Sequence, residues 1–179
     1  MAGETRWVGT WATSPLPVDD AAFGNQTLRM IARISLGGSR LRVRFSNACG
    51  RAPLALGRAE VALRAAGGAI VPSSSRALRF AGRNGATVAA GAPIVSDPVD
   101  LAVPAGADLA VSLHLPGRVD PAFGVTGHGN ARQTGYISPP GDFADAVEMP
   151  GARPTEDLLF LGGIEVLAPP QAGAVVAFG

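Results

Sequence analysis

The clearest pattern in the chain is an alternation of apolar and polar side chains across residues 27–46. Period-two alternation is typical of a β-strand with one buried face. A Gly37-Gly38 pair interrupts the pattern, and glycine adopts turn conformations without steric cost. We therefore predict a β-hairpin over Thr27–Ser46, with an apolar inner face and an arginine-bearing face exposed to solvent. The apolar positions are Leu28, Met30, Ala32, Ile34, Leu36, Leu41, Val43 and Phe45.

Shorter segments show the same alternation between clusters of turn residues, and no stretch has a convincing helical period with proper caps. This spacing predicts an all-β fold, an antiparallel β-sandwich. Two glycine- and proline-rich segments, Pro116–Arg132 and Pro139–Glu156, carry no strand pattern. Loops this long usually bind or cover something. The further predicted strands are Arg58–Leu63, Ala77–Phe80, Thr87–Ala89, Pro93–Ser96, Val99–Leu101, Asp108–Leu115, Gln133–Ser138 and Leu158–Leu167.

Composition favours a folded β-rich protein and argues against disorder and nucleic-acid binding. Among 179 residues the chain has 24 glycines and 15 prolines, which suits many short strands and turns. Charged residues make up 16% and hydrophobic residues 47%, which argues against disorder. The net charge of +1 and the absence of aromatic residues within the arginine stripe Arg40, Arg42 and Arg44 disfavour nucleic-acid binding.

Cysteine and histidine are too scarce for a thiolate or histidine-rich metal site, because the chain has one cysteine, Cys49, and two histidines. Asp19, Asp20, Asp142 and Asp145 have no spacing typical of a calcium loop. We expect neither metal nor cofactor. No apolar run has the roughly 20 residues of a membrane helix, and the first residues lack a signal-peptide pattern, so the compartment stays open.

The last eleven residues differ from the rest. Pro169-Pro170-Gln171 is typical of a short stiff connector, and Ala174–Phe178 is a continuous apolar run. Such a run predicts a strand buried on both faces, as in the parallel sheet of an α/β domain. We expect residues 1–168 to form the β-domain, and residues 169–179 to be a linker and the first strand of a domain not contained in this sequence.

Several blocks of the sequence together resemble a bacterial group of SGNH (GDSL-type) hydrolases that carry an N-terminal β-domain. Cys49 departs from the aromatic residue more common in that group. The final block is similar to the strand that enters the family's Gly-Asp-Ser motif, with Gly179 as its glycine. The blocks are Trp7–Pro15, Asn25–Arg29, Leu41–Asn47, Val95–Val99, Thr126–His128, Gln133–Tyr136 and Gly173–Gly179.

The resemblance implies a jelly-roll-like accessory domain beside an esterase active site. It places the serine nucleophile, the histidine base and the oxyanion hole after Gly179, so this chain alone is expected to be inactive. The implied partner is the catalytic half, in the same or a separate polypeptide, and the implied substrates are carboxylic esters or acylated carbohydrates. The alternatives are a stand-alone carbohydrate-binding module and a structural β-domain without a ligand.

Three residues are candidates for substrate contact. His128 and Arg132 lie in or beside the glycine-rich segment Gly127–Gln133, and loops on a rigid scaffold often carry binding residues. Trp11, four residues after Trp7, offers an aromatic face, although core packing explains both tryptophans as well. His114 falls on the polar face of its strand, and Asn47 precedes Gly50 at a predicted turn. We expect structural roles for both.

Overall fold

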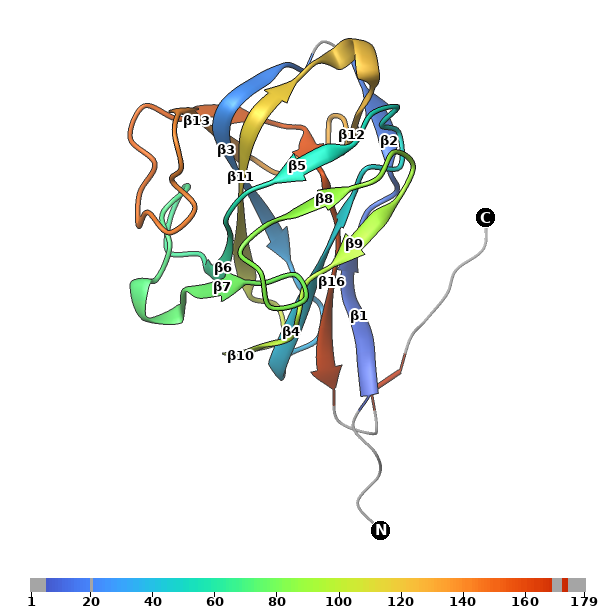
Figure 1. Cartoon of the computed structure of the whole chain (residues 1–179). Helices are drawn as coiled ribbons and strands as arrows, with labels where there is room; N and C mark the ends of the chain where they lie inside the picture. Colours follow the sequence, from blue (N-terminus) through green and yellow to red (C-terminus); the bar gives the residue numbers. More distant parts are fainter. Residues whose placement is uncertain (1–5, 20, 169–171, 174–179) are drawn as a thin grey trace.

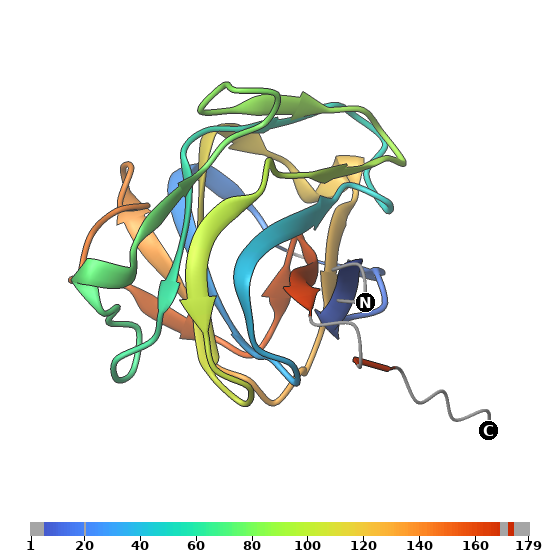
Figure 2. The ribbon, with the colours of Figure 1, turned by 90° about the horizontal axis from the view of Figure 1, so that it is seen from below.

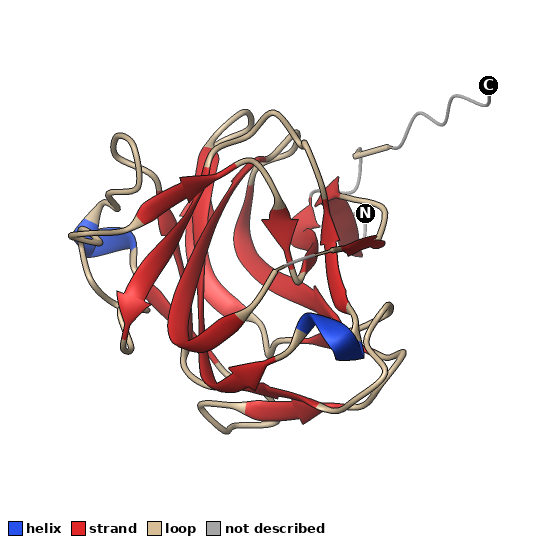
Figure 3. Cartoon of the chain, turned by 90° about the horizontal axis from the view of Figure 1, so that it is seen from above, coloured by secondary structure: helices blue, strands red, loops and turns tan. Residues whose placement is uncertain are grey.

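The computed structural model describes residues 6–19, 21–168 and 172–173. These residues form an all-β structure of several antiparallel sheets, with two single 3-10 turns, no α-helix and no closed barrel (Figure 3). The all-β prediction is confirmed. None of the described residues form a helix long and apolar enough to cross a membrane.

The strands and turns follow one another closely along the chain. They are β1 (Arg6–Ala12), β2 (Leu16–Val18), β3 (Phe23–Arg33), β4 (Gly38–Ser46), β5 (Leu54–Leu56), β6 (Ala59–Leu63), η1 (Pro72–Ser74), β7 (Arg76–Leu78), β8 (Ala86–Val88), β9 (Pro93–Val95), β10 (Val99–Val103), β11 (Asp108–Val119), η2 (Pro121–Phe123), β12 (Val125–His128), β13 (Gly135–Pro140), β14 (Arg153–Thr155), β15 (Leu158–Leu159) and β16 (Leu161–Ala168).

Two large sheets face one another across the core (Figures 1 and 2). One has six strands in the order β14-β13-β3-β11-β6-β7. The other has five, in the order β1-β16-β4-β10 with β9 paired to β4. Two small sheets, β15-β12-β2 and β5-β8, complete the described fold.

The predicted hairpin over Thr27–Ser46 is wrong, because β3 and β4 belong to different sheets. The long partner of β3 is β11, and β4 pairs with β16. Alternation shows which face of a strand is buried but does not identify its neighbour. Gly37 is needed for close approach, since a Cβ there would lie 2.5 Å from the carbonyl oxygen of Val103.

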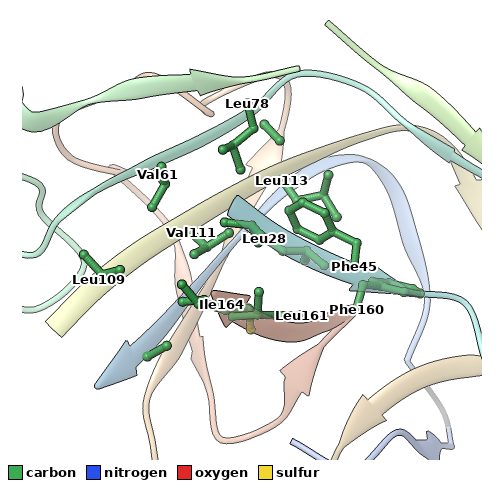
Figure 4. Packing of buried hydrophobic residues seen from close by; sticks show 14 of the residues in the cluster. Leu28, Phe45, Val61, Leu78, Leu109, Val111, Leu113, Phe160, Leu161 and Ile164 are labelled. Atoms are coloured by element: carbon green, nitrogen blue, oxygen red, sulfur yellow. The ribbon is translucent and has the colours of Figure 1, made fainter. Parts of the chain in front are cut away.

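The alternating apolar positions do fill the core as expected. Leu28 on β3 and Phe45 on β4 point toward each other from opposite sheets (Figure 4). The rings of Phe45 and Phe80 pack edge to face with centroids 6.0 Å apart. Both large sheets therefore share one hydrophobic cluster. Its other buried members include Met30, Ile34, Leu41, Val43, Val61, Leu109, Val111, Leu113, Leu161 and Ile164.

The predicted strand Leu158–Leu167 is interrupted at Phe160. This residue is 1% exposed and has φ +58°, a left-handed conformation that is unfavourable for a bulky side chain. β15 before it pairs with β12, whereas β16 after it pairs with β1 and β4. Phe160 is thus the corner at which the chain changes sheets.

The two unassigned segments are partly regular. Pro116–Arg132 holds the end of β11, the turn η2 and strand β12. Pro139–Glu156 contains the end of β13 and strand β14, and between them the chain crosses the outer face of the six-stranded sheet. We call residues 141–147 the strap, because they are tied down over that face.

The arginine-bearing face of β3 is only partly exposed, contrary to expectation, because Arg29 is covered whereas the Arg33 side chain is 71% exposed. Arg29 is 0% exposed beneath the strap. Its five N–H groups face five oxygens: Ser112 Oγ at 2.8 Å and the carbonyls of Gly68 at 2.7 Å, Val147 at 3.3 Å, Phe143 at 3.3 Å and Ala146 at 2.6 Å. Burial lowers the pKa of Arg29 to about 10, so the guanidinium stays charged at neutral pH.

Replacement of Arg29 by methionine will destabilise the fold strongly. Arg29→Met keeps an unbranched apolar stem but leaves four carbonyls and the Ser112 hydroxyl without their donor. We expect a loss of about 3 kcal/mol or more in the free energy of unfolding, seen as a Tm lower by about 6–12 °C. Arg33→Met on the same strand is the control, since its side chain is 71% exposed. Equal Tm values for the two variants would contradict this role.

Candidate functional site

Trp7 and Trp11 lie on opposite faces of β1. In a regular strand residues four apart share a face, but the register of β1 against β16 shifts between Gly9 and Trp11, and this β-bulge turns Trp11 to the other face. Trp11 packs against the hydrophobic core. The guanidinium of Arg42 lies 4.6 Å from the ring centre of Trp7 on the outer face.

His128 ends β12 and contacts the chain that follows Trp11. Its Nδ1 lies 3.1 Å from the carbonyl oxygen of Ser14, the geometry of an Nδ1–H donating to that carbonyl. Arg132 is exposed, with φ +54°. Across residues 6–19, 21–168 and 172–173, no hydrogen bond or ion pair joins any two of Trp11, His128 and Arg132. Gly179 lies outside the described residues.

A shallow pocket of about 230 Å³ opens beside Ser14. We call it the Thr13–Arg44 pocket. Because Ser14 lies between two of its lining residues, the imidazole of His128 supports the wall of this pocket. The lining residues are Thr13, Pro15, Arg44, Ser46, Ala48, Pro93 and Gly162.

The three arginines of the stripe on β4 pair with two acids on neighbouring strands. Arg40 pairs with Asp100 at 2.7 Å. Arg42 and Arg44 share Glu165, at 2.5 and 2.7 Å. The outer face of the five-stranded sheet therefore presents arginines that are all engaged in ion pairs.

A second polar cluster lies on the outer face of the six-stranded sheet. His114 is only 12% exposed at its side chain; Nε2 lies 2.9 Å from Asn25 Oδ1, and Nδ1 lies 3.9 Å from Asp142 Oδ2. Arg58 pairs with Asp142 at 3.5 Å and also with Asp145. The two strap aspartates considered for calcium thus face an arginine. Within the described residues no three metal-ligating side chains gather at one point.

Neither histidine lies where it could act as a general base that activates a nucleophile. In the part of the chain that the structure describes, His114 bonds an amide oxygen and His128 a backbone carbonyl, and neither bonds a hydroxyl or thiol. The N–H of Gly50 donates to the Asn47 backbone carbonyl at 3.0 Å, so the predicted turn is confirmed. The Asn47 side chain donates to the carbonyls of Ala52 at 2.9 Å and Ala89 at 3.2 Å.

The blocks that carry the family resemblance are paired in space. Ser14 of the first contacts His128 of another. Arg29 lies opposite Tyr136 in the pairing of β3 with β13, and Arg44 lies opposite Val95 in the pairing of β4 with β9. No protein-family model matches the chain, and no curated protein matches it.

Sequence reasoning missed the buried acid Glu60, which lies across β11 from Arg29 with Ser112 between them. Its carboxylate accepts a hydrogen bond from Ser75 Oγ at 3.0 Å. Burial raises the pKa of Glu60, with the strap aspartates adding to the effect and Ser75 opposing it. Glu60 is a charged residue in a predicted strand, but no pattern in the sequence indicated that other segments bury its side chain.

Glu60→Gln is expected to stabilise the protein near neutral pH. A raised pKa means that the folded state binds more protons than the unfolded state above the ordinary carboxyl pKa, so stability falls as pH rises through the pKa of the folded state. Glutamine removes that loss. The Tm of the variant will exceed that of the parent at about pH 7, and the difference will shrink at about pH 4. Exposed Glu156→Gln is the control, and a pH-independent difference for Glu60→Gln would refute the assignment.

Proposed function

We propose that this chain is the N-terminal, substrate-side domain of an SGNH-type serine esterase. Its fold is proposed to be a jelly-roll-like β-sandwich formed by the two large sheets. The catalytic half supplies the serine nucleophile, the histidine base with its orienting aspartate, and the oxyanion hole, which must converge on one carbonyl. That half follows Gly179 in the same polypeptide or is a separate chain. Carboxylic esters or acylated carbohydrates are the proposed substrates.

The observation that carries this proposal is the set of sequence blocks and their order. The structure adds one supporting feature, because blocks distant in sequence lie on neighbouring strands. Cys49, just after one block, donates from its backbone N–H to Thr126 Oγ1 of another at 2.9 Å. Because the blocks contact one another, they belong to the same folded domain, as expected if a family shares that domain.

The Thr13–Arg44 pocket is the proposed contribution of this domain to the substrate cleft. Arg44 is paired with Glu165, so the pocket offers a polar wall in which the guanidinium is already held by a carboxylate, and we propose that an ester binds beside it. His128 holds the Ser14 carbonyl and positions this wall. Arg132, exposed nearby in sequence, is proposed for the rim.

The decisive test extends the chain. We expect the coding sequence after Gly179 to continue with Asp-Ser. The extended protein will hydrolyse p-nitrophenyl esters and react with a fluorophosphonate, whereas the chain ending at Gly179 will do neither. Alanine in place of the new serine is the control and will abolish both signals. An extended protein inert to both reagents would reject the esterase and favour stand-alone carbohydrate binding. A stop codon after Gly179 would do the same if no second polypeptide that reacts with the fluorophosphonate co-purifies with the chain from its native source.

His128→Ala in that extended enzyme will raise KM and leave kcat nearly unchanged. The imidazole positions the pocket wall and does not touch the reacting carbonyl, so its loss weakens substrate binding alone. One lost hydrogen bond of about 0.5–1.5 kcal/mol corresponds to a rise of about 2–13-fold in KM. His114→Ala is the matched control with unchanged KM. A fall in kcat without a change in KM would contradict a substrate-side position.

A further inference from the structure

One asparagine of the chain lies in an exposed turn and directly precedes a glycine. Asn84 and Gly85 join the Phe80–Arg83 turn to strand β8. The hydrogen bonds of this region hold the turn before them, where the carboxylate of Asp97 accepts from the N–H of Gly82 at 2.7 Å. Asn84 itself is exposed, and its side chain forms no hydrogen bond with any described residue. The amide group of Asn84 is therefore free to rotate.

The backbone N–H of Gly85 is also free. The pairing of β8 with β5 begins one residue later, at Ala86 opposite Leu56. Among the described residues no oxygen accepts a hydrogen bond from the N–H of Gly85. Glycine has no Cβ, so nothing on that residue shields its nitrogen. An unbonded nitrogen and an unbonded side-chain amide thus lie on adjacent residues.

The other three asparagines of the chain lack this combination. They are Asn25, Asn47 and Asn130, and none of them precedes a glycine. Asn25 lies within β3, and Asn47 is 2% exposed. Asn130 is exposed, but the N–H of Ala131 after it donates to the carbonyl of Glu156 at 2.9 Å. Within residues 6–19, 21–168 and 172–173, the pair formed by residues 84 and 85 alone combines an exposed asparagine with an unbonded N–H on a following glycine.

These two groups can react with each other without a cofactor. The nitrogen of Gly85 loses its proton and attacks Cγ of Asn84, so that a new N–Cγ bond forms and the Cγ–Nδ2 bond breaks. The Nδ2 group leaves with that proton as ammonia. One water molecule then opens the resulting five-membered imide at either carbonyl carbon, which gives aspartate or isoaspartate. The net change replaces an amide by a carboxylic acid and consumes only water.

The small sheet that follows allows the movement that this reaction requires. The main chain must turn so that the nitrogen of Gly85 approaches the Asn84 side chain. Both residues lie at the end of the β5–β8 ladder, which has three residue pairs. The end of a short ladder opens locally at little cost in free energy. The reactive geometry is therefore accessible without global unfolding.

We propose that Asn84 is a site of spontaneous deamidation, because the fold leaves its amide and the following N–H free while it restrains the other asparagines. The site is independent of the proposed esterase role, since it needs no second domain. In isoaspartate the main chain gains one methylene group. A Cβ at Gly85 would lie 2.5 Å from the carbonyl oxygen of Leu56, so the lengthened chain has no room on that side and will disturb the start of β8.

The test follows the side-chain amide signals of the full chain, labelled with ¹⁵N, during incubation in mildly alkaline buffer. We expect the Asn84 signals to decay while those of Asn25, Asn47 and Asn130 persist. The decay will quicken as pH rises, because the attacking nitrogen must lose its proton. The aged chain will release ammonia and accept methyl groups from an isoaspartyl methyltransferase, whereas Asn84→Ser will do neither. Asn84 signals that persist as long as the other three would overturn the proposal.

Ala131→Gly separates the effect of the fold from that of the sequence motif. It creates a second Asn-Gly pair at the exposed Asn130, where the N–H of residue 131 bonds the Glu156 carbonyl. We expect Asn130 in this variant to deamidate about 2–13-fold more slowly than Asn84, the factor for one hydrogen bond of about 0.5–1.5 kcal/mol that must first break. Equal rates at the two positions would show that the motif alone sets the rate and would overturn the role given to the fold.

Discussion

One buried cation holds the outer face of the six-stranded sheet together. The guanidinium of Arg29 has no carboxylate partner among its contacts; five neutral oxygens surround it instead, and three of them are carbonyls of the strap. Removing a charge from water is costly unless every donor is satisfied. The carbonyls of the strap therefore replace the water molecules that would otherwise hydrate the Arg29 guanidinium. We infer that residues 141–147 and β3 fold together, because Arg29 is buried only when the strap is in place.

This arrangement limits where the protein binds other molecules. The strap crosses the outer face of the six-stranded sheet, and ion pairs with Asp100 and Glu165 engage the arginines on the other large sheet. The Thr13–Arg44 pocket lies where strands end, and it is built from segments distant in sequence.

The sequence predicted the class of fold and the buried positions better than it predicted the connections. Alternation identified the core faces of β3 and β4, yet the glycine pair between them joins two sheets and does not close a hairpin. A bulge between Gly9 and Trp11 turns the Trp11 side chain to the opposite face from Trp7, and the segment that covers Arg29 lies more than a hundred residues away in sequence. Periodicity reports one strand at a time, so contacts made by irregular backbone leave no trace in it.

The central claim is that the strap belongs to the folded core through Arg29. Amide hydrogen exchange tests it most directly. The N–H of Gly141 bonds the Asn25 carbonyl and that of Phe143 bonds Thr27 Oγ1 at 2.9 Å, so both amides report on the strap. We predict that they exchange as slowly as the amides of β3, through global unfolding. Exchange at the rate of an exposed loop, with β3 still protected, would contradict the account.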